Sequence, residues 1–344
     1  MDFVSLFSSF CVTGASLFAL KPVASKVGLM DRPGGRKTHA HPTPLIGGIG
    51  IYLGVVFISL FNPTVLNEYG NLLAISTIVL VLGAIDDYKH MPVGIRMGGQ
   101  AVAASLMYFT AGNQLTSFGN LFGFGDINLG VLSYPVTVFA TVGVINAINM
   151  SDGLDGLSGG MVAIAVTFLG IIAWQEGNII LLAFIAILLS ALIAFLALNF
   201  RLPWRKPALV YLGDSGSTFL GFVLAWLMIE STQGQNTIIP PVLALWFLAL
   251  PLMDTILLLV KRPLEGKSPF NPGRDHLHHK LLDMGYSKRR VVFSLYATGI
   301  ILGFNGFALN QQMIKESSAF FIFISLYLVY LLIINFIKVK DLKA

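Results

Sequence analysis

Long apolar runs constrain this chain more than any other feature of its sequence. Eleven of them have about the length that a bilayer demands of a helix, roughly 20 residues, and no polar segment between them could form a separate soluble domain. Their approximate limits are 3–20, 45–61, 71–85, 96–112, 131–148, 157–174, 178–198, 215–230, 239–260, 291–309 and 318–337. The sequence therefore predicts an all-α, polytopic membrane protein of about eleven helices, with residues 1–344 as a single membrane-embedded domain.

Composition and charge indicate the surroundings and the orientation of the chain. With 55% hydrophobic and 11% charged residues it is too apolar for a soluble core, so we expect a lipid bilayer around it and no nucleic-acid partner. If the N-terminus lies outside, every Lys and Arg except Lys315 falls in an inner loop or flank, and the C-terminus lies inside. The single cysteine, Cys11, excludes a disulfide framework and a cysteine-based metal site.

The inner loops also hold clustered acidic residues, above all in residues 149–156, Asn-Met-Ser-Asp-Gly-Leu-Asp-Gly. Asp152 and Asp155 are three residues apart and would share one side of a helical turn. The amide oxygen of Asn149 suits a hard cation, and the glycines allow a ligand to approach the backbone closely. A simple capped turn is the alternative for this stretch taken alone.

Two other acidic motifs open onto the same face. Asp86 and Asp87 end the third run, where adjacent like charges repel unless a cation is near, and Arg96 begins the fourth run and could reach a phosphate. Residues 211–217, Tyr-Leu-Gly-Asp-Ser-Gly-Ser, would present free backbone NH groups to an anion, and Asp214 would gather a divalent cation around it. Helix punctuation and a helix N-cap are the respective alternatives.

Asp254 and a histidine cluster complete the set. Asp254 lies inside the ninth run, where an ionisable residue is a functional candidate or a partner for the hydroxyl of another helix. Residues 274–280, Arg-Asp-His-Leu-His-His-Lys, would place His276 and His279 on one helical face if the helix began at Asp275. Zinc would need a further converging ligand, so diphosphate binding suits these histidines better. Together the motifs favour phosphoryl transfer with a lipid substrate.

The motifs together resemble the polyprenyl-phosphate N-acetylhexosamine-1-phosphate transferase family, in particular its bacterial WecA-type branch, from the first run to about Arg290. The matching stretches are 31–33, 36–39, 86–87, 149–156, 213–217, 251–254, 268–270 and 276–279. The resemblance implies transfer of N-acetylglucosamine 1-phosphate from UDP-N-acetylglucosamine to undecaprenyl phosphate, with release of UMP. It further implies that the enzyme requires Mg²⁺, which Mn²⁺ can replace, and that it lies in the bacterial inner membrane. The pathway would be the synthesis of a cell-envelope polysaccharide such as O antigen. A homodimer is compatible with this resemblance.

The resemblance also implies a role for each motif. Asp214 would be the principal Mg²⁺ ligand, Asn149 a second ligand, and Asp152 would lie near the metal. Asp86 would be the base for the lipid phosphate and Asp87 its electrostatic neighbour. The remaining contacts would be Arg96 with a phosphate, Gly153, Leu154 and Asp155 with the uracil, and Arg274, His276, His278 and His279 with the diphosphate and sugar.

Other functions fit the sequence less well. A secondary transporter would place polar groups near the bilayer midplane, whereas no Asp, Glu, Lys or Arg falls near the middle of a run. An intramembrane aspartyl protease would need a Gly-x-Gly-Asp signature, which fails at Tyr211 and leaves the histidines unexplained. The same transfer with another N-acetylated UDP-sugar stays open, while the His-Leu-His-His form argues against a peptide-bearing donor.

Overall fold

The computed structural model describes residues 3–32, 42–200, 208–234, 237–268 and 273–336, most of them in helices. The elements are α1 (Phe3–Val27), β1 (Met30–Asp31), β2 (Thr43–Pro44), α2 (Gly47–Leu60), α3 (Pro63–Lys89), α4 (Val93–Thr110), η1 (Gly130–Leu132), α5 (Ser133–Met150), α6 (Leu157–Gln175), α7 (Ile179–Asn199), α8 (Gly213–Thr232), α9 (Pro241–Phe247), α10 (Ala249–Leu264), α11 (Leu277–Asp283), α12 (Lys288–Gln311) and α13 (Glu316–Phe336). The matching stretches at 36–39 and 269–270 lie outside the described residues.

Every predicted run coincides with a helix or a helix pair, which confirms the all-α, multi-pass class. Seven described helices are long and apolar enough to cross a membrane. The ninth run is broken, because α9 and α10 meet at an 86° bend, and counting that pair as one span gives eight. The helix α2 has only 14 residues, so length and composition alone support fewer crossings than the eleven predicted.

Side-chain caps fix the starts of three long helices. Asn62 accepts a hydrogen bond from the backbone NH of Val65 at the start of α3, and Asn178 does the same for Leu181 at the start of α7. Ser287 caps α12. Such caps satisfy NH groups that the first turn of a helix leaves without a partner.

The helix α8 forms the centre of the fold, with every residue from 215 to 229 buried. Glycines bring its first turn close to two neighbouring helices. A Cβ on Gly48 of α2 would lie 2.1 Å from the Cα of Gly216, and one on Gly83 of α3 would lie 2.5 Å from the Cα of Ser215. Small residues permit this close approach of backbones. The start of α8 is therefore held beside the end of α3, where Asp86 and Asp87 stand.

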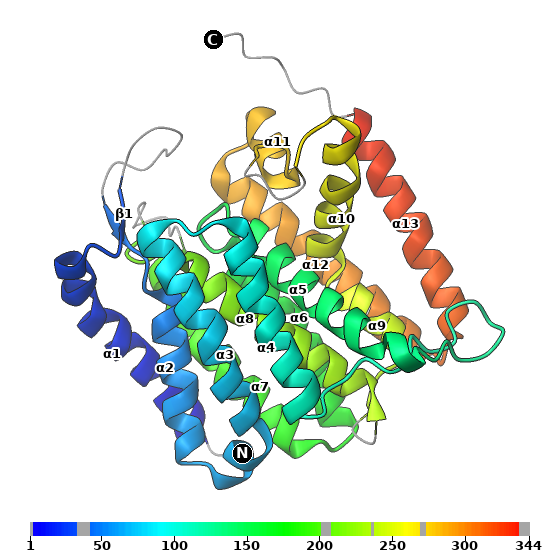
Figure 1. Ribbon diagram of the computed structural model, residues 1–344, viewed down its shortest axis with the longest axis horizontal. Coiled ribbons are helices and arrows are strands. Elements are labelled where there is room, and N and C mark those ends of the chain that lie inside the picture. The colour runs from blue at the N-terminus through cyan, green and yellow to red at the C-terminus, as the bar shows by residue number, and fades with distance from the viewer. Residues whose placement is uncertain (1–2, 33–41, 201–207, 235–236, 269–272, 337–344) are drawn as a thin grey trace.

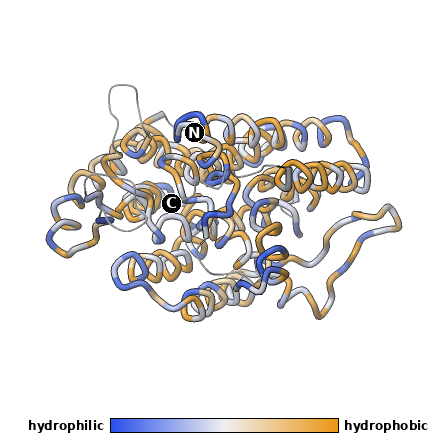
Figure 2. The backbone as a smooth tube through the Cα atoms, turned by 90° about the horizontal axis from the view of Figure 1, so that it is seen from above, coloured by the Kyte–Doolittle hydropathy of each residue, from blue (hydrophilic) through white to orange (hydrophobic). Residues whose placement is uncertain are grey.

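The polar motifs gather at one end of the bundle. The turn between α3 and α4, the strand β1, the end of α10 and the helix α11 all lie at the upper end of Figure 1, whereas the loop 111–129 lies toward the lower right. Hydrophobic residues predominate along the helices, as Figure 2 shows, and many large ones are exposed, among them Phe7, Phe139 and Leu332. An apolar outer surface of this kind is expected where lipid is the solvent.

Candidate active site

Asp87 binds the first turn of α8. The backbone NH of Asp214 donates to Oδ1 of Asp87 over 2.8 Å, and that of Ser215 donates to Oδ2 over 3.1 Å. Gly213 permits this contact, because its φ is +76° and a Cβ there would lie 2.6 Å from Oδ2 of Asp87. The prediction that these NH groups are free for a bound anion is therefore wrong, since the carboxylate of Asp87 occupies them.

Asp86 is paired with Arg96 across the turn between α3 and α4. The Arg96 guanidinium lies 2.7 Å from Oδ2 of Asp86, and the NH of Met91 donates to Oδ1 over 2.5 Å. The turn can fold back because His90 takes the left-handed conformation, at φ +51°, and ends α3. Only 3% of Asp86 is exposed. The pairing directs Arg96 toward the cleft that Asp86 also lines.

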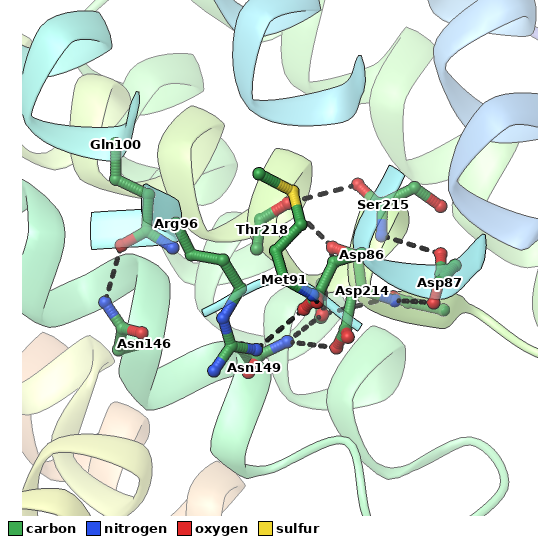
Figure 3. A network of polar contacts seen from close by, with 12 residues as sticks. Asp86, Asp87, Met91, Arg96, Gln100, Asn146, Asn149, Asp214, Ser215 and Thr218 are labelled. Atoms are coloured by element: carbon green, nitrogen blue, oxygen red, sulfur yellow. Dashed lines mark hydrogen bonds and ion pairs between the residues drawn. The ribbon is translucent and has the colours of Figure 1, made fainter. Parts of the chain in front are cut away.

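Asn149, from the end of α5, binds the first turns of α8. Its amide nitrogen donates to Oδ1 of Asp214 over 2.7 Å and to the hydroxyl of Ser217 over 2.8 Å. Figure 3 shows Asp86, Asp87, Asp214 and Asn149 side by side. The structure thus brings together residues from three predicted motifs that are far apart in the sequence.

Asp152 lies in the loop between α5 and α6 and faces the same cluster. Burial raises the pKa of its carboxyl well above the usual value, and the negative charges of Asp214, Asp87 and Asp155 raise it further. Four carboxylates therefore share one site with Arg96 as their only ion-pair partner among the described residues. Such a site attracts a further cation.

Two residues that sequence reasoning missed hold this loop in place. Asn199, at the end of α7, accepts a hydrogen bond from the NH of Gly156 over 2.5 Å and donates to the carbonyl oxygen of Val210 over 2.8 Å. The hydroxyl of Tyr296 donates to the carbonyl oxygen of Gly156. The only signal for Asn199 was a polar residue that ends a long apolar run. It ties the loop to the segment that leads into α8.

Leu154 anchors the middle of the loop. Its side chain is buried in an apolar cluster that includes Leu157, Leu250 and Leu295. A uracil would then meet the backbone of this segment and the carboxylate of Asp155, and the Leu154 side chain would support them from behind. The uracil contacts of residues 153–155 stay a prediction.

The histidine segment begins differently from the prediction. The helix α11 starts at Leu277, so His276 precedes it in extended conformation, and the expected common face of His276 and His279 is wrong. Instead the His276 ring lies nearly parallel to that of His278, with centroids 5.7 Å apart, and His278 meets His279 at 4.2 Å. Asp254 of α10 bonds Nδ1 of His276 over 2.8 Å.

His278 connects this segment to the loop of Asp152. A Cβ on Gly153 would lie only 2.1 Å from Nε2 of His278. That buried nitrogen has no hydrogen-bond partner among the described residues, and neither has Nδ1 of His279. Burial, reinforced by His279 and His276, lowers the pKa of His278 to about 3, so its ring is neutral at physiological pH. Burial and Arg274 lower the pKa of His279 as well.

Arg274 stands apart from the cluster. It is 54% exposed and pairs with Asp283 over 2.9 Å. A diphosphate would have to draw the guanidinium away from this partner, so its contact with substrate stays a prediction. The bidentate pair of Arg262 with Asp275, at 2.8 and 2.6 Å, instead holds the segment that leads into His276.

A second feature that sequence reasoning missed is an amide pair beside Arg96. Asn146 of α5 donates to the side-chain oxygen of Gln100 of α4 over 2.7 Å. Both line a small cleft together with Arg96, Asn149 and Asp214, as Figure 3 shows. The signal was available, because Gln100 follows Arg96 by four residues and Asn146 precedes Asn149 by three, which places each pair on one helical face.

The oxygen atoms that the site offers decide whether it can bind a divalent cation. No three His, Cys, Asp or Glu side chains among the described residues converge as a preformed metal site. Mg²⁺ is commonly held by one or two carboxylates, with substrate phosphates and water completing its shell. Asp214 and Asn149 fit that pattern, because the amide oxygen of Asn149 accepts no hydrogen bond within the described part of the chain.

The fold and the site define a class of protein. A multi-pass helical membrane protein that gathers carboxylates, an arginine and neutral histidines at one end of its bundle has the parts of a phosphoryl-transfer enzyme acting at a membrane surface. The central elements, α3 to α8, supply the carboxylates, and α10 and α11 supply the histidine segment.

Comparison with known proteins gives the family. The family model for glycosyl transferase family 4 matches residues 69–232. The chain is 37% identical to the undecaprenyl-phosphate alpha-N-acetylglucosaminyl 1-phosphate transferase of Yersinia pestis over 86% of this chain and 81% of that protein. It is 34% identical to the enzyme of that name from Escherichia coli K12 (94% and 89%) and 32% to that from Haemophilus influenzae (95% and 92%). The chain therefore belongs to the family of these transferases, which confirms the resemblance seen in its motifs.

Proposed function

We propose that this protein transfers N-acetylglucosamine 1-phosphate from UDP-N-acetylglucosamine to undecaprenyl phosphate, giving a lipid diphosphate sugar and UMP. The observation that carries the proposal is the meeting of Asp86, Asp87, Asn149 and Asp214 from three helices in one partly buried cluster. The printed names of the relatives supply the two substrates. The reaction would be the first membrane step of a cell-envelope polysaccharide pathway such as O antigen.

In the proposed reaction an oxygen of the lipid phosphate attacks the β-phosphorus of the donor. The bond from that phosphorus to the bridging oxygen breaks, and UMP leaves. Arg96 binds the lipid phosphate, and Asp86, which pairs with Arg96 over 2.7 Å, accepts its proton. His278 and His279 have buried ring nitrogens without a hydrogen-bond partner among the described residues. These nitrogens would donate to the diphosphate and stabilise the charge that develops on UMP.

We also propose that Mg²⁺, or Mn²⁺ in its place, is bound by Asp214 and Asn149, with Asp152 nearby. The ion would supply neutralisation of the diphosphate charge. Asp87 has a supporting role, because it holds the first turn of α8 and thereby fixes the backbone that carries Asp214. The excess of carboxylates over cations in the cluster supports this assignment.

The proposed setting is the bacterial inner membrane. We infer eleven crossings, with the N-terminus outside and the site in the cytoplasm, in one domain of residues 1–344. They are the seven long apolar helices, the bent α9–α10 pair, the short α2, and the two helices α4 and α8. Single cysteines placed at Asn113 and Gly273, in a Cys11→Ala background because Cys11 is exposed, should react with an impermeant reagent from opposite sides. Reaction from the same side would refute this topology.

The activity itself is tested with purified protein, undecaprenyl phosphate, Mg²⁺ and a panel of UDP-sugars. UDP-N-acetylglucosamine should release UMP faster than the other N-acetylated sugars. The Asp214→Asn variant serves as the inactive control. If another N-acetylated UDP-sugar is used faster, the reaction class stands and the donor changes; if none releases UMP, the proposed function is wrong.

A further inference from the structure

Asp254 on α10 is only 8% exposed, and its carboxylate takes part in three hydrogen bonds. Its Oδ2 lies 2.8 Å from Nδ1 of His276. Its Oδ1 accepts the backbone NH of Leu277 and the hydroxyl of Tyr330, each over 3.0 Å. Tyr330 belongs to α13, the last of the described helices, so three separate segments meet at this carboxylate.

The arrangement fixes both the plane of the carboxylate and the tautomer of the histidine. Because Tyr330 and Leu277 both donate to Oδ1, the other oxygen of Asp254 is left for the imidazole. A carboxylate can only accept hydrogen bonds, so Nδ1 of His276 carries a proton and donates it. A second partner of this kind commonly sets the orientation of a functional histidine.

The orientation of His276 affects the rest of the site through the ring of His278. Its ring is 6% exposed and lies parallel to that of His278 within 12°. His278 in turn contacts Gly153 of the loop that carries Asp152. A change in the plane of the Asp254 carboxylate would therefore displace rings that face the proposed diphosphate site.

Tyr330 is the point where α13 reaches the site. The helix otherwise packs loosely on the rest of the protein, because only 17% of its apolar stretch is buried. Tyr330 packs against Leu257 and Leu258 of α10. Tyr327, one turn earlier, stacks on the Tyr330 ring at 6.3 Å, but its hydroxyl has no hydrogen bond among the described residues. The two tyrosines thus share a helix and similar packing and differ in one polar contact.

We propose that Tyr330 is a positioning residue of the transferase site, which acts through Asp254 to hold His276 and the imidazole stack behind the donor diphosphate. The inference rests on the proposed function. It makes α13 a part of the active site.

The test compares Tyr330→Phe with the matched control Tyr327→Phe. Tyr330→Phe removes only the hydroxyl and should lower kcat about three- to tenfold, the usual worth of one side-chain hydrogen bond. The KM for undecaprenyl phosphate should stay within about twofold, because the lipid phosphate meets Arg96 on the other side of the site. Tyr327→Phe should match the wild type.

A double-mutant cycle separates positioning from general support of α13. In a His276→Ala background, Tyr330→Phe should have no further effect, because the group that it orients is gone. Where turnover in that background is too slow, the dissociation constant for UDP-N-acetylglucosamine gives the same comparison by calorimetry. Asp254→Asn either places an amide NH₂ opposite the NH at Nδ1 of His276 or releases the His276 ring from its partner. This variant should therefore lower kcat at least as much as Tyr330→Phe.

Three results would overturn the inference: equal kinetics of the two Tyr→Phe variants, an undiminished loss from Tyr330→Phe in the His276→Ala background, or wild-type kcat in Asp254→Asn. Failure of the proposed function is a distinct outcome, because the wild-type protein would then release no UMP from any UDP-sugar. An active wild type with a silent Tyr330→Phe variant contradicts the positioning role alone.

Discussion

The contact between Gly153 and His278 leads to a sharp prediction. An added Cβ at Gly153 would lie 2.1 Å from Nε2 of His278, whereas ordinary contacts of a Cβ begin at 3.4 Å. The imidazole must therefore retreat by more than 1 Å or turn out of the stack. A displacement of about 1 Å at a catalytic group can cost on the order of 100-fold in rate. We expect Gly153→Ala to lower kcat by about that factor while the protein stays folded.

The assay is UMP release at saturating UDP-N-acetylglucosamine and undecaprenyl phosphate, with the melting temperature followed in parallel. Gly143→Ala is the matched control, because nothing lies within 4 Å of a Cβ built there. If the effect passes through His278, Gly153→Ala should cost nothing more in a His278→Ala background. A Gly153→Ala enzyme with wild-type kcat would refute the link between the loop and the histidine segment.

Three further predictions concern the carboxylates. Asp214→Asn should abolish turnover and weaken Mg²⁺-dependent donor binding in calorimetry; unchanged Mg²⁺ dependence would remove Asp214 from the metal site. Asp86→Asn should lose turnover yet bind UDP-N-acetylglucosamine with near-native affinity, whereas a matching loss of affinity would assign it to the donor. Asp152→Asn should raise the melting temperature of the metal-free protein. The native pKa of Asp152 lies above its ordinary value of 3.8, so its ionisation costs stability as pH rises. The difference in melting temperature between Asp152→Asn and the wild type should therefore widen from about pH 4 to pH 7. A difference that stays constant over this range would contradict the raised pKa of Asp152.

The sequence predicted those features that follow from local chemistry. Apolar runs locate the helices, and acidic residues at the ends of the runs mark the site, because charge is costly to bury without a use. Asp86 and Asp214 were identified in this way and Asn149 by its amide oxygen in the stretch 149–156, and the structure brings the three together. Their common placement follows because the turns that carry them lie at one end of the bundle.

The partners of these residues could not be predicted in the same way. Whether the NH groups at the start of α8 face a ligand or Asp87 depends on the close approach of two helices at Gly83 and Ser215. The start of α11 at Leu277 depends on Asp254, which accepts the NH of Leu277 and holds His276 outside the helix. Both outcomes are set by contacts between segments distant in sequence, and no local pattern encodes them.

The central claim is that this chain moves a sugar together with its phosphate. The most direct measurement uses UDP-N-acetylglucosamine labelled with ³²P in the β-phosphate and follows the label after incubation with the protein, Mg²⁺ and undecaprenyl phosphate. If the sugar moves together with its phosphate, the label should enter the lipid and unlabelled UMP should appear in equal amount. Label that stays with the nucleotide as UDP would show transfer of the sugar alone and would refute the proposed function.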